Sequence, residues 1–302
     1  MRYRQLGDSG LTVSVVGLGC NNFGGRIDLE ASRAVVERAL DLGVTLLDTA
    51  DTYGNRGGSE EVLGEVLGRR RDEVVIATKW GNEMGTGERE ARGGRRYIRM
   101  AVEASLRRLR TDRIDLYQLH NPDPRTPIGE TLAALDELVD EGKIRYVGSS
   151  NFAAWEVADA DWTARSAGLE RMISAQNHYS LLERGVETEL LPACRRFGVG
   201  VLPYFPLANG LLTGKYRRGE PMPERTRLSG RDIEASTFER IEALERFALE
   251  RGHSLLELAF AGLLAHPEVA SVIAGATRAE QVEANVAAGE WELDPEELGE
   301  LD

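Results

Sequence analysis

Short apolar runs rich in β-branched residues alternate along the chain with longer segments in which apolar residues recur every three or four positions. The first pattern is typical of buried strands and the second of amphipathic helices, so the alternation predicts repeated βαβ units with a parallel sheet. We predict eight strands, at Val15–Gly19, Thr45–Leu47, Val74–Thr78, Ile114–Leu119, Ile144–Gly148, Met172–Ala175, Gly200–Pro203 and Ser271–Ala274.

Helices are predicted after these strands, and one of them, near 129–141, carries a clear apolar stripe of Leu132, Leu135, Leu138 and Val139. Two short strands, Tyr3–Leu6 and Thr12–Val15, flank the turn residues 7–10 and predict an N-terminal β-hairpin. The predicted helices are Leu29–Leu42, Ser59–Leu67, Arg95–Arg110, Gly129–Glu141, Ala153–Ala167, Gly185–Phe197, Ser254–Ala265 and Ala279–Ala287, with an extra helix at Phe238–Arg251 after strand seven.

Eight alternating strands and helices suit either a (β/α)8 TIM barrel or an open doubly wound sheet. The nearest approach to a dinucleotide-binding GxGxxG loop is residues 17–22, Gly-Leu-Gly-Cys-Asn-Asn, where the third glycine is replaced and no helix is predicted to begin. Because barrels of roughly 200 to 250 residues or more fold as one unit, we expect residues 1–302 to form a single α/β barrel domain.

Composition and charge narrow the class of protein. The chain is 42% hydrophobic and 29% charged, its start lacks a signal-peptide segment, and no apolar run approaches the roughly 18 to 20 residues of a membrane span. We expect a cytoplasmic protein, with Cys20 and Cys194 reduced and with a monomer as the default state. The net charge of −13 disfavours nucleic acids and anionic membranes as partners, and no metal-ligand spacing is present.

Polar side chains follow nearly every predicted strand. In a barrel the carboxyl ends of all strands meet at one mouth, so these side chains are expected to converge on a single site. Each also has a structural explanation: Asp48 or Asn151 as a cap, Lys79 as a surface residue, His120 as a buried structural histidine. The polar residues are Asp48, Tyr53, Lys79, His120, Ser149, Ser150, Asn151, Gln176, Asn177 and Tyr204.

The motifs that carry these residues resemble those of the aldo-keto reductase family, and they span the chain in that family's order. They are Gly43–Ala50 with Tyr53 and Gly54, Ile76–Lys79, Asp115–His120, Gly148–Phe152, Gln176 with Asn177, Leu207–Lys215, and Gly275–Arg278 with Gln281 and Asn285. The resemblance implies reduction of an aldehyde or ketone with NADPH, a small-molecule carbonyl or alcohol substrate, and a catalytic tetrad of Asp48, Tyr53, Lys79 and His120.

In that tetrad Tyr53 would donate a proton as hydride reaches the carbonyl carbon, while His120 would hydrogen-bond the carbonyl oxygen. Lys79, oriented by Asp48, would lower the pKa of Tyr53 toward the working range. One unit charge at about 4 Å and an effective dielectric near 20 is worth roughly 4 kcal/mol before desolvation is subtracted.

The resemblance also implies the cofactor contacts. Ser150, Asn151 and Gln176 would hold the nicotinamide carboxamide, Tyr204 would stack on its ring, and Thr277 with Arg278 at a helix N-terminus would favour NADPH over NADH through its 2′-phosphate. Ala284 departs from the family, which often has an acidic residue there. The remaining contacts are Pro206, Leu207, Gly210, Leu211, Gly214, Lys215 and Arg227 around the pyrophosphate, and Gly275, Gln281 and Asn285 near the last helix.

Substrate-binding residues are less legible, because loops determine them. Candidate pocket walls are Asn22, Phe23, Trp80 and Phe205, and the glycine-rich loop Gly81–Arg95 is a candidate lid. A short C-terminal tail suggests an open pocket for bulky carbonyl compounds, and His178, His253 and His266 are interpreted as structural or surface residues. Two alternatives stay open: an NADPH-binding regulatory subunit, since potassium-channel β subunits share the resemblance, and a cofactor-independent hydrolase or isomerase.

Overall fold

Eight parallel strands form one sheet in the computed structural model, which describes residues 1–85, 91–220, 227–229 and 232–301. The strand order is β10-β3-β4-β5-β6-β7-β8-β9, so consecutive strands are neighbours throughout. The strands are β3 (Val16–Gly19), β4 (Leu46–Asp48), β5 (Val75–Trp80), β6 (Ile114–Leu119), β7 (Ile144–Ser150), β8 (Met172–Gln176), β9 (Gly200–Val201) and β10 (Val272–Gly275).

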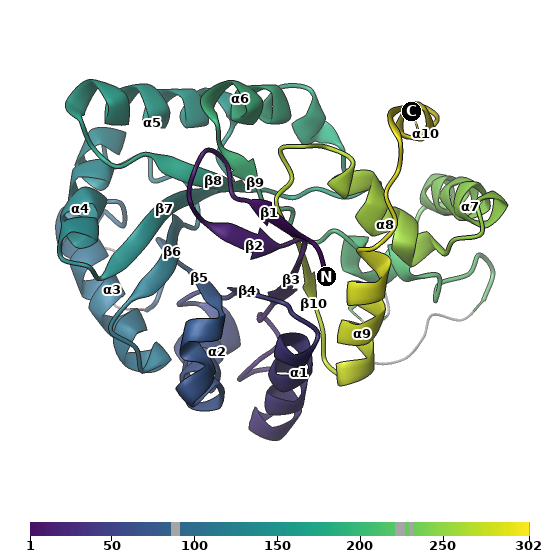
Figure 1. The fold of residues 1–302 in the computed structure, drawn as a ribbon, viewed down its shortest axis with the longest axis horizontal. Coiled ribbons are helices and arrows are strands. Elements are labelled where there is room, and N and C mark those ends of the chain that lie inside the picture. The colour runs from purple at the N-terminus through teal and green to yellow at the C-terminus, as the bar shows by residue number, and fades with distance from the viewer. Residues whose placement is uncertain (86–90, 221–226, 230–231, 302) are drawn as a thin grey trace.

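The two ends of this sheet meet and close it. Val201 of β9 forms a parallel bridge with Val269, just before β10. The Val201 N–H donates to Glu268 O at 2.7 Å, and the Ala270 N–H donates to Val201 O at 3.0 Å. Ring closure of eight parallel strands, with helices outside them (Figure 1), confirms the predicted (β/α)8 barrel.

The helices surround the barrel, and their apolar stripes face it. Leu132, Leu135 and Leu138 are fully buried, as the stripe predicts, and Val139 packs partly buried against the same core. The helices are α1 (Leu29–Asp41), α2 (Tyr53–Leu67), η1 (Gly68–Glu73), α3 (Arg95–Leu109), α4 (Ile128–Asp140), α5 (Ala154–Ala167), η2 (Gly185–Glu187), α6 (Leu190–Phe197), η3 (Ala208–Thr213), α7 (Ala235–Glu250), α8 (Leu255–Leu264), α9 (Ala279–Ala288) and α10 (Pro295–Gly299).

Several boundaries differ from the predictions for local reasons. The helix predicted over Gly185–Phe197 is two elements, because the ring of Pro192 clashes with the carbonyl four residues earlier and α6 therefore starts at Leu190. The strand predicted to reach Pro203 ends at Val201. The short helix α10 was not predicted, although Asp294 caps it by accepting from the Glu296 and Glu297 N–H groups.

The predicted hairpin is present and plugs one end of the barrel. Strands β1 (Tyr3–Gln5) and β2 (Thr12–Ser14) pair antiparallel, and Figure 1 shows them crossing the barrel. Leu6 and Val13 are fully buried and belong to one cluster with barrel residues, among them Leu46 and Leu116. The hairpin covers the amino-terminal end of the strands, which leaves the carboxyl end for a ligand site.

The extra helix predicted after strand seven is α7, which lies with α10 on one side of the molecule (Figure 1). In the described part of the chain, no helix combines the length and the apolar character that a membrane crossing requires.

Candidate active site

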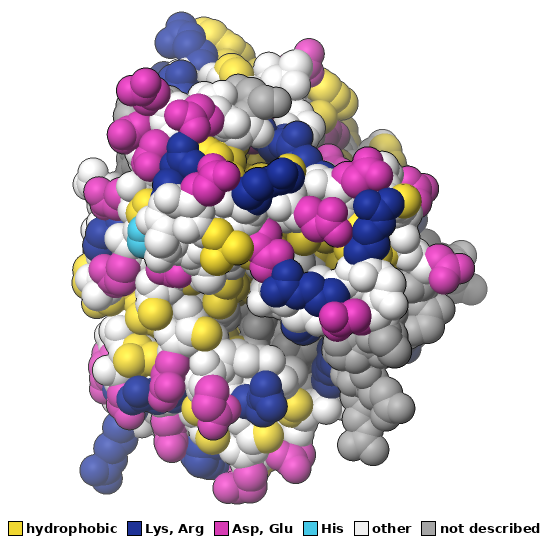
Figure 2. All heavy atoms as spheres, turned by 90° about the vertical axis from the view of Figure 1, so that its right-hand side faces the viewer, with side chains coloured by type: hydrophobic (Ala, Val, Ile, Leu, Met, Phe, Trp, Pro, Cys, Tyr) yellow, Lys and Arg dark blue, Asp and Glu magenta, His cyan; other side chains and the backbone are white. Residues whose placement is uncertain are grey.

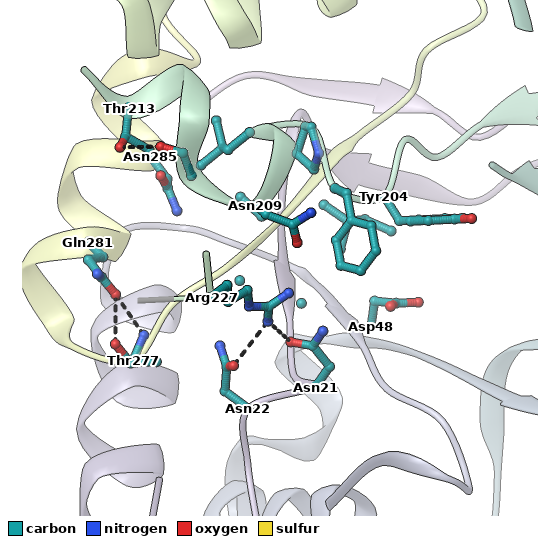
Figure 3. Close-up of a pocket in the computed structure, with 18 of the residues that line it drawn as sticks. Asn21, Asn22, Asp48, Tyr204, Asn209, Thr213, Arg227, Thr277, Gln281 and Asn285 are labelled. Carbon is teal, nitrogen blue, oxygen red and sulfur yellow. Dashed lines mark hydrogen bonds between the residues drawn. The ribbon is translucent and has the colours of Figure 1, made fainter. Parts of the chain in front are cut away.

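A cavity of about 830 Å³ opens at the carboxyl ends of the barrel strands. Residues at or just after the ends of seven strands line it, and Lys79 of β5 lies buried beneath it. Figure 3 shows part of this lining. The strand-end residues are Gly19, Asp48, His120, Ser150, Asn151, Gln176, Tyr204 and Gly275.

Asp48 and Lys79 form a buried ion pair at the base of the cavity. Lys79 Nζ lies 2.7 and 2.8 Å from the two carboxylate oxygens of Asp48 and donates to Thr49 O at 2.9 Å. The lysine side chain is fully buried. Burial opposes its charge, but Asp48 and Tyr53 outweigh burial and raise the pKa of Lys79, so this lysine is an ammonium ion.

Tyr53 lies beside this pair, with Lys79 Nζ 5.1 Å from the centre of its ring. Burial raises the pKa of Tyr53 above its ordinary value, and Lys79 offsets this only in part because Asp48 acts in the opposite sense. Lys79 acts in the predicted direction and lowers the pKa of Tyr53. Desolvation and Asp48 together exceed its effect, so the net pKa is raised and does not reach the predicted working range.

His120 contacts Tyr53 edge-on, with ring centres 5.7 Å apart. Burial, and then the charge of Lys79, lowers the pKa of His120 to about 3, so the imidazole is neutral near pH 7. Its Nδ1 atom is buried and has no hydrogen-bond partner among the described residues. A neutral imidazole has one N–H to donate, which suits a hydrogen bond to an oxygen that gains negative charge.

Strand β7 and the segment after β9 place amide and hydroxyl groups around the same cavity. Ser150 is in register with Gln176 of β8, and Tyr204 Oη donates to Asn151 Oδ1 at 2.8 Å. Asn151 Nδ2 donates to His120 O at 2.9 Å, so Asn151 connects the segments that follow β6 and β9. Ser149 instead donates to Ser174 O, since neighbouring strand residues face opposite sides of the sheet.

Strained backbone gathers at the mouth of the cavity. Asn151, Phe205 and Asn209 have φ values of 61°, 53° and 58°, a region that non-glycine residues rarely adopt. Directly after Tyr53, residues 54–57 are left-handed too, so the regular part of α2 begins close to the predicted start at Ser59. Such strain persists where the surrounding structure fixes it, often at ligand sites.

The far end of the cavity is positively charged, although the whole chain is acidic. Burial lowers the pKa of Lys215, and the nearby charges of Arg26, Arg227 and Arg278 lower it further. Arg227 donates to Asn21 Oδ1 at 3.0 Å and to Asn22 Oδ1 at 3.1 Å (Figure 3). All four cations line the cavity, whose described lining contains one carboxylate, the paired Asp48.

The outer surface is different: over α7 to α10, acidic and basic side chains are intermixed (Figure 2). The excess of cations inside the cavity therefore fits an anionic ligand.

Helix α9 begins at this charged end. Arg278 is its N-cap and makes no side-chain cap, while Gln281 Oε1 accepts from the Thr277 N–H at 2.7 Å and from its hydroxyl at 3.1 Å (Figure 3). Free N–H groups and the helix dipole at such an end favour a bound phosphate. Asn285 lies two turns along the helix and also lines the cavity.

Most of the residues proposed as cofactor contacts line this one cavity, but Leu211 and Gly214 lie outside its described lining. The candidate substrate residues divide: Asn22 and Phe205 line the cavity, while Phe23 and Trp80 are fully buried and do not line it. Trp80 stacks on Tyr117, with ring centres 4.4 Å apart, because its side chain faces the helical layer.

Among the lining residues that were not predicted individually are Asn21, Arg26, Asn209 and Thr213. Asn21 and Arg26 follow the first barrel strand, where position alone could have indicated them.

Of the candidate lid 81–95, residues 86–90 lie outside the described residues. Gly93, in the C-terminal part of this loop, donates its N–H to Asp123 Oδ2 at 2.7 Å. Among the described residues, no group of His, Cys, Asp and Glu side chains is arranged to hold a metal ion.

Comparison with known proteins gives the family. The sequence model of the Aldo/keto reductase family matches residues 15–302. An uncharacterized oxidoreductase of Bacillus subtilis is 38% identical, covering 99% of this chain and 94% of its own. A probable voltage-gated potassium channel subunit beta of Arabidopsis thaliana is 36% identical, covering 95% of this chain and 91% of its own. The L-glyceraldehyde 3-phosphate reductase of Escherichia coli is also 36% identical, covering 100% of this chain and 92% of its own. The chain therefore belongs to the aldo/keto reductase family and is an oxidoreductase.

Proposed function

We propose that this protein reduces an aldehyde or ketone to an alcohol with NADPH, and that Tyr53 donates the proton. The observation that carries the proposal is a single cavity with two chemically distinct ends. One end holds Tyr53 and His120 above the buried Asp48–Lys79 pair. The other carries four cations and the start of α9.

The cavity residues fit a nicotinamide dinucleotide phosphate. Ser150, Asn151 and Gln176 offer donors and acceptors for a carboxamide, and Tyr204 offers an aromatic face. Lys215, with Arg227 and the residues from Pro206 to Gly210, would hold the pyrophosphate. Bound there, the reduced cofactor would supply the hydride that the chain's own side chains lack.

Tyr53 supplies the proton in this proposal. Its raised pKa keeps the hydroxyl protonated at neutral pH, so the acid form is present before reaction. As the substrate oxygen gains charge, the Tyr53 O–H bond breaks and a new O–H bond forms on that oxygen. The phenolate left behind faces the Lys79 ammonium ion, and Asp48 holds that ion in place. Neutral His120 stabilises the same developing charge by donating a hydrogen bond.

NADPH is preferred to NADH in this proposal because cations surround the start of α9. Arg278, Thr277 and the first N–H groups of the helix would bind a 2′-phosphate, which NADH lacks. The absence of an acidic side chain at Ala284, which lines the cavity, removes a source of repulsion for that phosphate.

A regulatory role is the second candidate, and one comparison favours it. The relative named as a potassium channel subunit beta is as similar to this chain as the relative named as a reductase. Sequence identity therefore does not separate an efficient reductase from a subunit that binds NADPH and rarely reacts.

The test uses Tyr53→Phe, which removes the hydroxyl and keeps the ring, with Tyr3→Phe as the control at a half-exposed tyrosine. NADPH binding is followed by fluorescence, and turnover by NADPH absorbance against a panel of carbonyl compounds. The panel includes bulky aromatic aldehydes and ketones, and L-glyceraldehyde 3-phosphate.

We expect Tyr53→Phe to bind NADPH normally and to lose turnover by about 10²-fold or more. Retained turnover would exclude Tyr53 as the acid. Tight NADPH binding by the unmodified protein, with no turnover on any member of the panel, would favour the regulatory role.

A further inference from the structure

A second group of buried charges lies behind the Asp48–Lys79 pair. Asp51, in the segment that joins β4 to Tyr53, is 1% exposed, and Glu60 of α2 is fully buried. Neither residue lines the cavity. The Asp51 N–H donates to Lys79 O at 3.0 Å, so this segment is attached directly to the strand that carries the catalytic lysine.

The two carboxyl groups have unequal surroundings. Glu60 accepts from Thr78 Oγ1 at 2.6 Å and from Arg108 Nε of α3 at 2.7 Å, so both of its oxygens are satisfied. Asp51 Oδ1 is buried with no hydrogen-bond partner among the described residues. The Tyr117 hydroxyl of β6 is also buried with no hydrogen-bond partner among the described residues. Burial raises the pKa of this hydroxyl most, and the charge of Asp51 raises it further.

The buried charges do not balance if every group is ionised. Lys79 neutralises Asp48, and Arg108 neutralises Glu60, so the third carboxyl group, Asp51, has no ion-pair partner among the described residues. An isolated buried carboxylate is costly, and the usual outcome is that the group takes up a proton. In agreement, burial and then the charge of Glu60 raise the pKa of Asp51 to about 7, against the opposing effects of Arg108, the Thr52 N–H and Lys79.

We propose that Asp51 is a positioning residue whose carboxyl group carries a proton, because this buried cluster has three carboxyl groups and two cations. Loss of that proton places an unbalanced negative charge behind Lys79 and Tyr53. That charge makes Tyr53 a weaker acid, because the phenolate formed during reduction then lies near one more negative group. Protonated Asp51 is accordingly the form that supports fast reduction. The effect on activity rests on the proposed role of Tyr53, whereas the protonation of Asp51 does not.

The titration of Asp51 can be distinguished from that of the groups around it. It is faced by Glu60 of α2, Arg108 of α3, Lys79 of β5 and Tyr117 of β6. Burial raises the pKa of the Tyr117 hydroxyl well above its ordinary value, and Lys79 stays charged. In the tetrad, the pKa of His120 is about 3 and that of Tyr53 is raised. In this cluster, a transition near neutral pH therefore belongs to Asp51.

The experiment measures protonation and catalysis separately, on the full-length protein. Infrared spectra between pH 5 and 9 follow the C=O band of a protonated carboxyl group, which needs no substrate. Reductase kcat/KM is measured with NADPH over the same range. The variants are Asp51→Asn, Glu60→Gln, and the control Asp161→Asn, which removes a buried carboxyl group on α5 paired with Arg165 and Arg171.

We expect the unmodified protein to lose a carboxyl C=O band with a midpoint near pH 7, and kcat/KM to fall roughly fivefold through the same midpoint, because one added negative charge disfavours the Tyr53 phenolate. Asp51→Asn should lack both transitions. Asp161→Asn should keep both. Glu60→Gln leaves Arg108 available to Asp51, so both midpoints should move to lower pH.

Absence of the band in the unmodified protein, or its persistence in Asp51→Asn, would overturn the assignment of the proton to Asp51, whatever the activity. A band assigned to Asp51, together with a kcat/KM transition that survives in Asp51→Asn, would overturn its link to Tyr53. If Asp51→Asn does not fold, the unmodified protein and Glu60→Gln still decide both points through the position of their midpoints.

Discussion

Gln176 Nε2 donates a hydrogen bond to Asp48 Oδ1 at 2.8 Å, from β8 to β4 across the mouth of the barrel. The two residues are 128 positions apart in the sequence. The bond connects an amide proposed to hold the nicotinamide with the carboxylate that orients Lys79, so the proposed cofactor site and the proposed proton donor would share one contact.

Gln176→Met should therefore impair both functions. Hydrogen bonds to charged groups contribute roughly 1.5–3 kcal/mol, so we expect kcat to fall about tenfold or more and NADPH binding to weaken measurably. Steady-state kinetics and fluorescence titration check this. Gln118→Met, a buried glutamine on β6 that does not line the cavity, is the control and should keep NADPH affinity. An effect on KM for the carbonyl substrate alone would contradict the shared contact.

Arg278→Ala should change cofactor preference rather than chemistry. The side chain lies at the start of α9, where the 2′-phosphate of NADPH is proposed to bind. A charge-assisted hydrogen bond contributes roughly 1.5–3 kcal/mol, so we expect NADPH affinity to fall by about tenfold or more while NADH affinity changes little. Arg246→Ala, an exposed arginine on α7, is the control. Equal losses for both dinucleotides would place the 2′-phosphate elsewhere.

The convergence of the candidate residues could be predicted because it follows from topology. In a closed parallel barrel every strand delivers its carboxyl end to the same mouth, so a residue such as His120 or Gln176 is located by its place in the repeat. The barrel, the hairpin and the extra helix α7 were predicted for the same reason: period, turn residues and strand count are local properties of the sequence.

Other features depend on distances between elements and could not be predicted from the sequence. The pKa of Tyr53 is set by how completely the fold buries its hydroxyl and by the closeness of Asp48, and neither follows from spacing. Trp80 and Phe23 stand next to site residues in the sequence, but their side chains pack into the core. The unequal surroundings of Asp51 and Glu60 appear only when α2, α3 and β5 are brought together.

His120 should make the protein less stable in acid. In the folded protein its pKa is about 3, against roughly 6.5 in an unfolded chain, so below about pH 6.5 only the unfolded state takes up the proton. The contribution of neutral His120 to the free energy of unfolding is therefore fully present above that pH. It is lost as pH falls toward 3, and the loss is roughly 3 kcal/mol at pH 4.

Urea unfolding at pH 4 and pH 7 measures this loss, and His120→Asn should reduce the difference between the two pH values. His253→Asn, a histidine paired with Glu257, serves as the control. An unchanged pH dependence in His120→Asn would show that the imidazole is not buried in its neutral form.

Gly64 of α2 should tolerate no side chain, because the backbone of α3 lies against it. A Cβ atom at Gly64 would clash with Arg108 O and would lie 2.7 Å from Leu109 C, and backbone cannot yield as a flexible side chain can. Gly64→Ala must separate α2 from α3, and we expect unfolding to become easier by about 2 kcal/mol or more. The same shift would move Arg108 away from Glu60, so activity should fall together with stability.

Gly129→Ala is the matched control, since it also lies inside a helix, α4, and its Cβ atom would approach Thr163 Cγ2 only to 3.5 Å, an ordinary contact. Because alanine favours a helix over glycine by roughly 0.5–1 kcal/mol, Gly129→Ala should leave stability unchanged or increased. Thermal and urea unfolding of the two variants separate the explanations. If both lost similar stability, the cause would lie in the helical backbone; a loss confined to Gly64→Ala locates it at the α2–α3 contact.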